Sequence, residues 1–145
     1  MQQTDLSDHT DDDVIASGVS QTSLREARDL VKLFAAVTTS KNVDDFLSGF
    51  TDDCIVHYGE FPLMTGKAQF RPFVEQMFSP RLENFVCTKS LRSLNGNVIG
   101  GTWNATWIDG KSKQKKAGRG FEFWIMRGNQ IARWDAAFNA WDDES

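Results

Sequence analysis

The sequence predicts an α+β fold in which three helices precede an antiparallel sheet, and two observations support this class. Up to about residue 78, apolar residues recur mostly at three- and four-residue intervals, which is typical of amphipathic helices. After Pro80 the pattern changes to alternation, and turn signals divide the remainder into four strands: Asn95-Gly96, Asp109-Gly110 and Arg127-Gly128-Asn129. We therefore expect helices packed across one face of a curved antiparallel sheet.

The N-terminal tail differs in composition from the rest of the chain. Residues 1–20 contain five Asp and no Lys or Arg, and they show no hydrophobic periodicity. We predict a disordered acidic tail at residues 1–20 and a single domain at residues 21–145. The tail lacks the basic start and apolar run of a signal peptide, and no segment has the roughly 18 apolar residues of a membrane span. We therefore expect a soluble, cytoplasmic protein that does not bind membranes.

The three helices have recognisable starts. Ser23 and Glu26 form a capping box ahead of a helix over residues 24–39. Asn42 is expected to cap a short second helix, and a third helix is predicted near residues 67–78, although Pro72 weakens its first turns. A strand is expected at residues 54–58, between the second and third helices, from its β-branched and aromatic content.

Charge, cysteine and histidine usage narrow the possible partners. The whole chain has a net charge of −4, but residues 21–145 carry 16 basic and 15 acidic side chains. A nearly neutral domain argues against nucleic acid as a partner. Cys54 and Cys87 lie in strand-like runs, which favours buried reduced thiols over a disulfide. With only His9 and His57 available, a metal site built on imidazole is not expected.

The last predicted strand provides the candidate catalytic group. Side chains alternate between the two faces of a strand, so Asp135 shares one face with Arg133, Ala137 and Asn139. Small residues beside Asp and Asn suggest the wall of a cavity rather than an ordinary solvent-facing surface. The alternative is a surface Asp135 paired with Arg133 or Arg119.

Three segments resemble a known superfamily: residues 50–58 (FTDDCIVHY), residues 65–67 (TGK) and residues 126–135 (MRGNQIARWD). Together they are similar to the nuclear transport factor 2-like superfamily, which includes SnoaL-like polyketide cyclases, ketosteroid isomerase, scytalone dehydratase and limonene epoxide hydrolase. The resemblance covers residues 24–141. It implies a cone-shaped fold in which the three helices lie across the concave face of the sheet and enclose one pocket.

The resemblance also implies site residues. The general base of SnoaL-like cyclases falls on Asp135, and a substrate-contacting or catalytic position of related enzymes falls on Tyr58. The cyclase histidine falls at or next to Phe121, so this partner is missing. A second acid of ketosteroid isomerase falls close to Glu122, but a one-residue shift in register would turn Glu122 to the other face.

Together the pattern and the resemblance define a predicted pocket. Asp135 and Tyr58 are the catalytic candidates, and the substrate-binding candidates are Asn104, Thr102, Arg119, Phe121, Asn139 and His57. His57 lies on the opposite strand face from Tyr58, so a structural or interface role is its alternative. Loss of hydration raises the pKa of a pocket carboxylate, which suits it to proton transfer.

These candidates predict a cofactor-free isomerase, cyclase or dehydratase with no metal, acting on a small hydrophobic oxygenated metabolite. The alternative is a non-catalytic small-molecule-binding or dimerisation module on the same fold. A homodimer is also expected. Trp103 and Trp107 share one strand face, as Trp134 and Phe138 do, and such aromatic faces suit pairing of two sheets.

Overall fold

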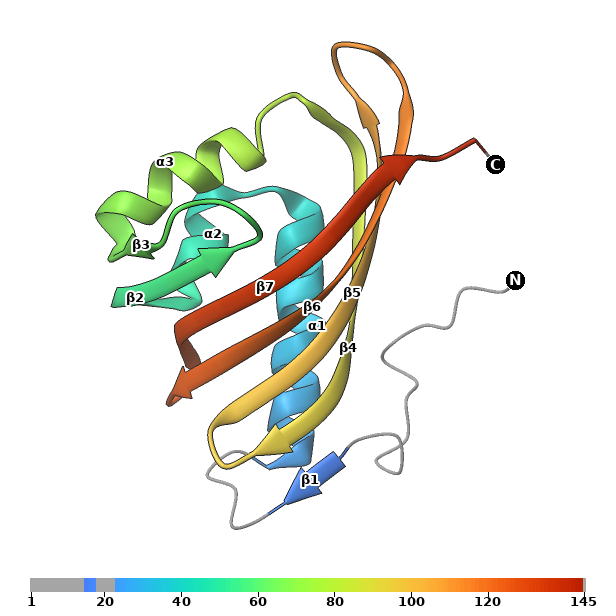
Figure 1. The fold of residues 1–145 in the computed structure, drawn as a ribbon. Coiled ribbons are helices and arrows are strands. Elements are labelled where there is room, and N and C mark those ends of the chain that lie inside the picture. The colour runs from blue at the N-terminus through green and yellow to red at the C-terminus, as the bar shows by residue number, and fades with distance from the viewer. Residues whose placement is uncertain (1–14, 18–22, 145) are drawn as a thin grey trace.

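The computed structural model describes residues 15–17 and 23–144. A strongly curved sheet carries the helices on its concave side, which gives the cone-shaped α+β fold (Figure 1). Within the described residues the sheet has seven strands in the order β1-β4-β5-β6-β7-β2-β3. None of the helices in this part of the chain is long and apolar enough to span a bilayer.

The three predicted helices are confirmed, as α1 (Leu24–Ser40), α2 (Val43–Ser48) and α3 (Lys67–Met77). The Ser23 hydroxyl accepts a hydrogen bond from the Glu26 amide at 3.1 Å, and the Asn42 side chain caps α2 in the same way at 2.9 Å. These caps satisfy amides that have no partner within the helix, so they fix where each helix starts. Pro72 is accommodated inside α3, which continues past it.

The four C-terminal strands form the predicted antiparallel meander. They are β4 (Leu82–Asn95), β5 (Val98–Asp109), β6 (Lys115–Arg127) and β7 (Gln130–Asp142). The remaining strands are β1 (Ile15–Ser17), β2 (Phe50–Tyr58) and β3 (Met64–Thr65). The sheet is mixed rather than wholly antiparallel, because β2 runs parallel to β7 and β1 runs parallel to β4.

Strand β1 corrects one part of the sequence analysis. Residues 15–17 were expected to belong to a disordered tail, but they pair with residues 93–95 at the edge of the sheet. A three-residue strand added to an existing edge needs little hydrophobic pattern of its own, so periodicity did not reveal it. The rest of the predicted tail lies outside the described residues.

Irregular pairing accompanies the curvature of the sheet. The register shifts between Glu83 and Val86 and between Leu91 and Ser93 on β4, and between Ile125 and Met126 on β6. Such bulges bend the strand that carries them and increase its twist. The meander therefore curls around the helices instead of lying flat beneath them (Figure 1).

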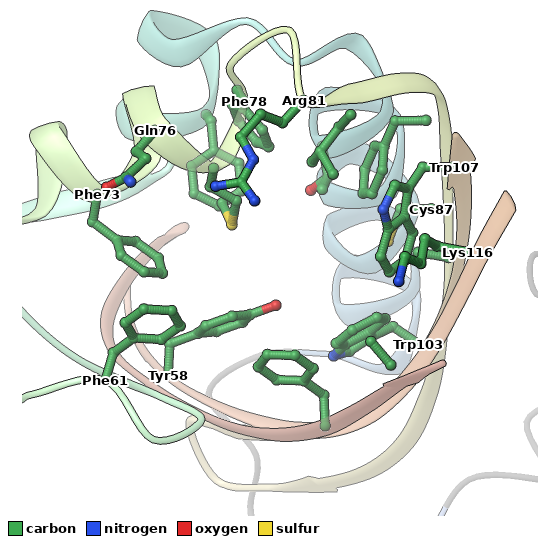
Figure 2. A pocket seen from close by; sticks show the side chains of 18 of the residues that line it. Tyr58, Phe61, Phe73, Gln76, Phe78, Arg81, Cys87, Trp103, Trp107 and Lys116 are labelled. Carbon is green, nitrogen blue, oxygen red and sulfur yellow. The ribbon is translucent and has the colours of Figure 1, made fainter. Parts of the chain in front are cut away.

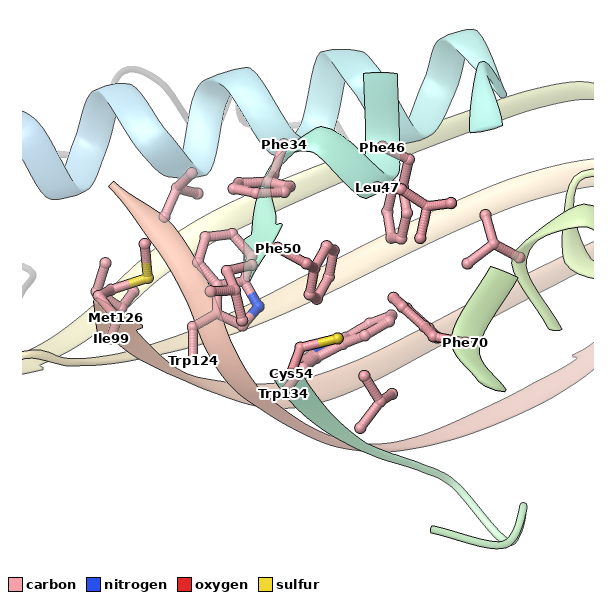
Figure 3. Close-up of a cluster of buried hydrophobic side chains, with 14 of the residues drawn as sticks. Phe34, Phe46, Leu47, Phe50, Cys54, Phe70, Ile99, Trp124, Met126 and Trp134 are labelled. Carbon is pink, nitrogen blue, oxygen red and sulfur yellow. The ribbon is translucent and has the colours of Figure 1, made fainter. Parts of the chain in front are cut away.

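Aromatic rings fill the space between the helices and the concave face (Figure 3). Phe50 lies 5.0 Å from Phe70 and 5.3 Å from Phe46, measured between ring centroids, and Trp134 lies 5.9 Å from Phe50. Edge-to-face and tilted pairs of this kind add to the stabilisation that burial alone provides. Cys54 and Cys87 are buried free thiols, as predicted.

The convex face carries different aromatic residues from those expected. Trp103, Trp134 and Trp124 are buried on the concave side, and Trp107 and Phe138 pack there as well. Phe121 and Phe123 of β6 instead point outward, with 58% and 55% of their surface exposed. The tryptophans and Phe138 predicted to form the dimer face are therefore wrong for that role. Alternation alone does not say which face of a strand is buried.

We propose that two copies of the chain associate through the convex face around Phe121 and Phe123, since neighbouring exposed rings favour burial against a partner. Sedimentation of the wild-type protein is expected to give about twice the chain mass. Replacing both rings, as Phe121→Lys with Phe123→Lys, should give a folded monomer. Leu33→Lys, which charges an equally exposed apolar position on α1, should leave the dimer intact. A monomeric wild-type protein at micromolar concentration would refute the proposal.

Candidate functional site

A cavity of about 630 Å³ opens between α3, the end of β2 and the concave face of the meander. Its wall is mainly aromatic (Figure 2). The ring-bearing residues that line it are Phe46, Tyr58, Phe61, Phe73, Phe78, Phe85, Trp103, Trp107, Trp134, Phe138 and Trp141. A volume of this size with apolar walls and few polar groups is typical of small-molecule sites.

Period-two alternation brings these rings together. Trp134, Phe138 and Ala140 of β7 all line the cavity, as do Cys87 and Lys89 of β4 and Trp103, Ala105 and Trp107 of β5. Each set is spaced by two or four residues, so each points to the same side of the sheet. The concave faces of β4, β5 and β7 therefore all contribute side chains to the cavity wall, with β6 between β5 and β7 in the sheet.

Gly120 allows Trp103 to lie close against the sheet. A Cβ atom added at Gly120 would sit 2.7 Å from the Trp103 indole and 2.6 Å from the Ala137 carbonyl oxygen. Both distances are too short for real Cβ contacts. A side chain at position 120 would push the indole into the cavity, so this glycine helps to set the shape of the wall.

A buried ion pair lies at the inner end of the cavity. The Lys89 ammonium is 2.8 Å from Oε2 and 3.1 Å from Oε1 of Glu122, and only 6% and 3% of the two side chains are exposed. Lys89 lines the cavity. Charges this deep are tolerated only with partners that replace water.

Two indoles complete the shell around the Glu122 carboxylate. Trp124 and Trp134 each donate their indole N–H to Oε1 at 3.0 Å. The carboxylate thus accepts four hydrogen bonds, two from Lys89 and two from the tryptophans. The Glu122 carboxylate therefore has its oxygens occupied by donors from the protein itself.

The same arrangement keeps Lys89 charged. Burial alone lowers the pKa of an ammonium group, but the adjacent Glu122 carboxylate outweighs this effect and holds the pKa of Lys89 above its ordinary value. The ammonium also lies 5.7 Å from the centroid of the Trp124 ring, within the range of a cation–π interaction. Lys89 is therefore a fixed hydrogen-bond donor rather than a nucleophile.

Tyr58 contributes a second donor. Its ring packs 4.9 Å from Trp134 and 4.8 Å from Phe138, and its hydroxyl points into the cavity (Figure 2). Among the described residues the hydroxyl has no hydrogen-bond partner. Burial, reinforced by the negative charge of Glu122, raises the pKa of Tyr58 above its ordinary value, so the hydroxyl stays protonated. Burial likewise raises the pKa of the Cys87 thiol, which argues against a thiolate nucleophile.

Asp135 does not share this site. Its carboxylate accepts hydrogen bonds from Arg133 at 2.8 and 3.3 Å, and both side chains are more than one-third exposed. Asp135 lies on the face of β7 opposite to Trp134 and is not part of the cavity lining. The prediction of a desolvated pocket base at Asp135 is therefore corrected: the structure shows the alternative, a surface pair with Arg133.

The substrate-binding candidates also lie outside the cavity. Cross-strand pairing places them in neighbouring rows on the convex face: Asn104, Arg119 and Asn139 in one row, Thr102 and Phe121 in the next, and His57 beside Asp135. Thr102 accepts a hydrogen bond from Arg92 at 3.1 Å, and the others are exposed. Alternation grouped these residues correctly, but it assigned them to the wrong face, and only Tyr58 lines the cavity as predicted.

Lys89 and Glu122 are site residues that strand alternation in the sequence does not by itself identify. One clue for Glu122 was available, because it alternates with Trp124 and Met126, and those apolar side chains mark the buried face of β6. Lys89 likewise alternates with Cys87 and Leu91 on β4. A charged residue that alternates with buried apolar residues must itself be buried, so it needs a partner of opposite charge. Here Lys89 and Glu122 are each other's partner.

Removing one half of the ion pair should be costly. Glu122→Gln leaves the Lys89 ammonium buried without a counter-charge, and we expect a loss of about 3–5 kcal/mol in the free energy of unfolding. Adding Lys89→Met to this variant removes the stranded charge, while the amide oxygen introduced at position 122 still accepts from an indole. The double variant should therefore be more stable than Glu122→Gln alone. Urea denaturation of the three proteins measures this, and an unchanged midpoint for Glu122→Gln would contradict the arrangement.

Tyr58 is the only tyrosine in the chain, so tyrosinate absorbance reports on it alone. We expect the folded protein to show almost no tyrosinate at the ordinary pKa of 10.0. Because the folded-state pKa is raised, the stabilisation from the protonated hydroxyl is complete below pH 10 and is lost as the pH rises through the folded-state pKa. The urea-unfolded chain provides the control and should titrate near the ordinary value. Half-ionisation of the folded protein at that pH would show that the hydroxyl is solvated.

Comparison with known proteins agrees with this architecture. The model of the SnoaL-like domain family matches residues 30–134. No curated protein sequence matches the chain significantly.

Solved structures share the fold at low sequence identity. The epoxide hydrolase/cyclase-like enzyme SalBIII, described in pyran ring formation in the polyether salinomycin, has a TM-score of 0.71 at 9% identity, over 82% of this chain and 97% of that one. A protein with a ketosteroid isomerase-like fold from Catenulispora acidiphila has a TM-score of 0.66 at 17% identity, over 74% and 83%. TerC, co-crystallised with polyporic acid, has a TM-score of 0.66 at 13% identity, over 78% and 91%. With the family match covering most of its length, the chain belongs to the SnoaL-like domain family.

Proposed function

We propose that the chain is a cofactor-free enzyme of the isomerase or cyclase type, which binds a small hydrophobic carbonyl compound in the aromatic cavity. The observation that carries the proposal is the pair of hydrogen-bond donors at the inner end of the cavity, the Lys89 ammonium and the Tyr58 hydroxyl. Membership of the SnoaL-like family and structural likeness to cyclase-like enzymes support an enzymatic role.

The proposed chemistry is stabilisation of a developing oxyanion. When a proton leaves the carbon next to a carbonyl, negative charge moves to the carbonyl oxygen, and donors fixed beforehand stabilise that charge most in a site that excludes water. Lys89 is held in place by Glu122, and Tyr58 remains protonated. Asp135 takes no part, because its carboxylate is paired with Arg133 on the convex face.

A specific observation favours a second candidate function, which is binding without catalysis. Among the described residues, Asp109 is the carboxylate that lines the cavity, and Glu122, next to the lining residue Lys89, accepts four hydrogen bonds with its oxygens. Hydrogen bonds from Ser112 lower the pKa of Asp109, which makes it a weak base. Under the first proposal the proton therefore passes to water or to a group of the substrate itself.

Hydrogen–deuterium exchange of 2-tetralone, an enolisable aromatic ketone, separates the two candidates. If the cavity stabilises an enolate, the wild-type protein should accelerate exchange next to the carbonyl. Tyr58→Phe should reduce that acceleration by about 10²–10³-fold, and so should Lys89→Met combined with Glu122→Gln, which leaves no buried charge unpaired; this is the usual effect of losing one oxyanion donor.

Asp135→Asn serves as the matched control and should exchange like the wild type. Saturable binding of the ketone with no acceleration of exchange would reject the catalytic proposal and favour the binding function. Loss of activity in Asp135→Asn would contradict the assignment of the site to the concave face.

A further inference from the structure

Arg81 occupies a distinctive place at the cavity mouth. It follows α3 closely in the chain, it is exposed, and it lines the cavity. Figure 2 shows its guanidinium turned inward, over the space between the aromatic walls. Within the described part of the chain, this guanidinium makes no hydrogen bond and no ion pair.

The other charged groups that line the cavity are already engaged. Lys116 is paired with Asp142 at 2.5 Å. Asp109 accepts a hydrogen bond from the Ser112 amide at 2.7 Å, and this bond keeps its pKa low. At the inner end, the charges of Lys89 and Glu122 cancel each other. The positive charge of Arg81 is felt by the Asp109 carboxylate, but no hydrogen bond or ion pair within the described residues joins the two, so the N–H donors of the Arg81 guanidinium are left for a ligand.

The two ends of the cavity thus suit different chemical groups of a ligand. At the inner end, an ion pair of zero net charge and a neutral Tyr58 hydroxyl suit a neutral oxygen acceptor. The negative charge of Glu122 disfavours a further anion there, and it also helps to keep Tyr58 protonated. At the mouth, a planar guanidinium with free donors suits a carboxylate, which it can bind in a bidentate manner.

We propose that the cavity selects a hydrophobic keto acid, bound with its carboxylate on Arg81 and its ketone toward Lys89 and Tyr58. The inference rests on the proposed function and adds the class and the orientation of the ligand. A group with a single negative charge fits the mouth better than a dianion such as phosphate, because the Asp109 carboxylate also lines the mouth.

Two probes of equal size test the charge preference: 4-benzoylbenzoate, which is an anion, and 4-benzoylbenzamide, which is neutral. Quenching of the tryptophans that line the cavity reports binding of both. The wild-type protein should bind the benzoate about tenfold more tightly, which corresponds to about 1.4 kcal/mol. Arg81→Gln should remove this preference and leave the affinity for the amide unchanged. Arg119→Gln, which removes an exposed arginine from the convex face, should retain it.

The ketone of the same probes also tests orientation, because irradiation attaches it to nearby C–H bonds. In the wild-type complex with the benzoate, attachment is expected on peptides that contain Lys89, Trp103 or Trp134. Attachment at Phe61 or Trp141 near the mouth would overturn the proposed orientation. Equal affinity of the two probes for the wild-type cavity would overturn the keto-acid selectivity alone, whereas failure of both probes to bind would overturn the selectivity and the proposed function together.

Discussion

The buried pair of Lys89 and Glu122 is the constraint on which the rest of the site depends. Lys89 comes from β4 and Glu122 from β6, and the two indoles that complete the shell come from β6 and β7. The carboxylate therefore joins side chains from three strands on the concave face. Because a buried charge is stable only with its partners in place, these hydrogen bonds favour the register in which the three strands bring the four side chains together.

The hydrophobic core and the cavity are parts of the same aromatic layer. Trp134 packs against Phe50 and Phe70 on the core side, donates to Glu122, and also lines the cavity next to Tyr58. The layer is filled where the buried core cluster lies, and it is hollow at the cavity, whose lining includes Thr38 of α1 and Phe46 of α2 (Figure 2). Packing against the core therefore helps to hold the hydrogen-bond donors Tyr58 and Lys89 in place before a substrate binds, as preorganised catalysis requires.

Local sequence signals predicted the elements of this fold well, and tertiary packing explains what they missed. The caps at Ser23 and Asn42 and the turns at Gly96 and Gly128 act within a few residues, so they can be recognised without knowing the fold. The parallel pairing of β2 with β7 joins segments about 80 residues apart, and no local pattern encodes it. Strand β1 is too short to show a period at all.

The error at the site has a single physical origin. The alternation in β7 correctly separated Asp135 from Trp134, but which side becomes the interior depends on where the helices pack. Small residues beside Asp135 favour the polar row as the cavity wall, whereas in the structure the aromatic row forms both the core and the wall. A stronger guide was the placement of Glu122 between Phe121 and Phe123: its carboxylate is in phase with Trp124, and that shared phase indicated a buried charge in need of a cation.

The central claim is that Lys89 is a permanently charged donor, held at the inner end of the cavity by Glu122. The most direct measurement is the hydrogen exchange rate of the Lys89 ammonium, followed by nitrogen-edited NMR at neutral pH. The account predicts slow exchange and a visible ammonium signal for Lys89, together with its loss in Glu122→Gln, while exposed lysines such as Lys113 exchange too rapidly to be seen. A Lys89 ammonium that exchanges as fast as that of Lys113 would contradict it.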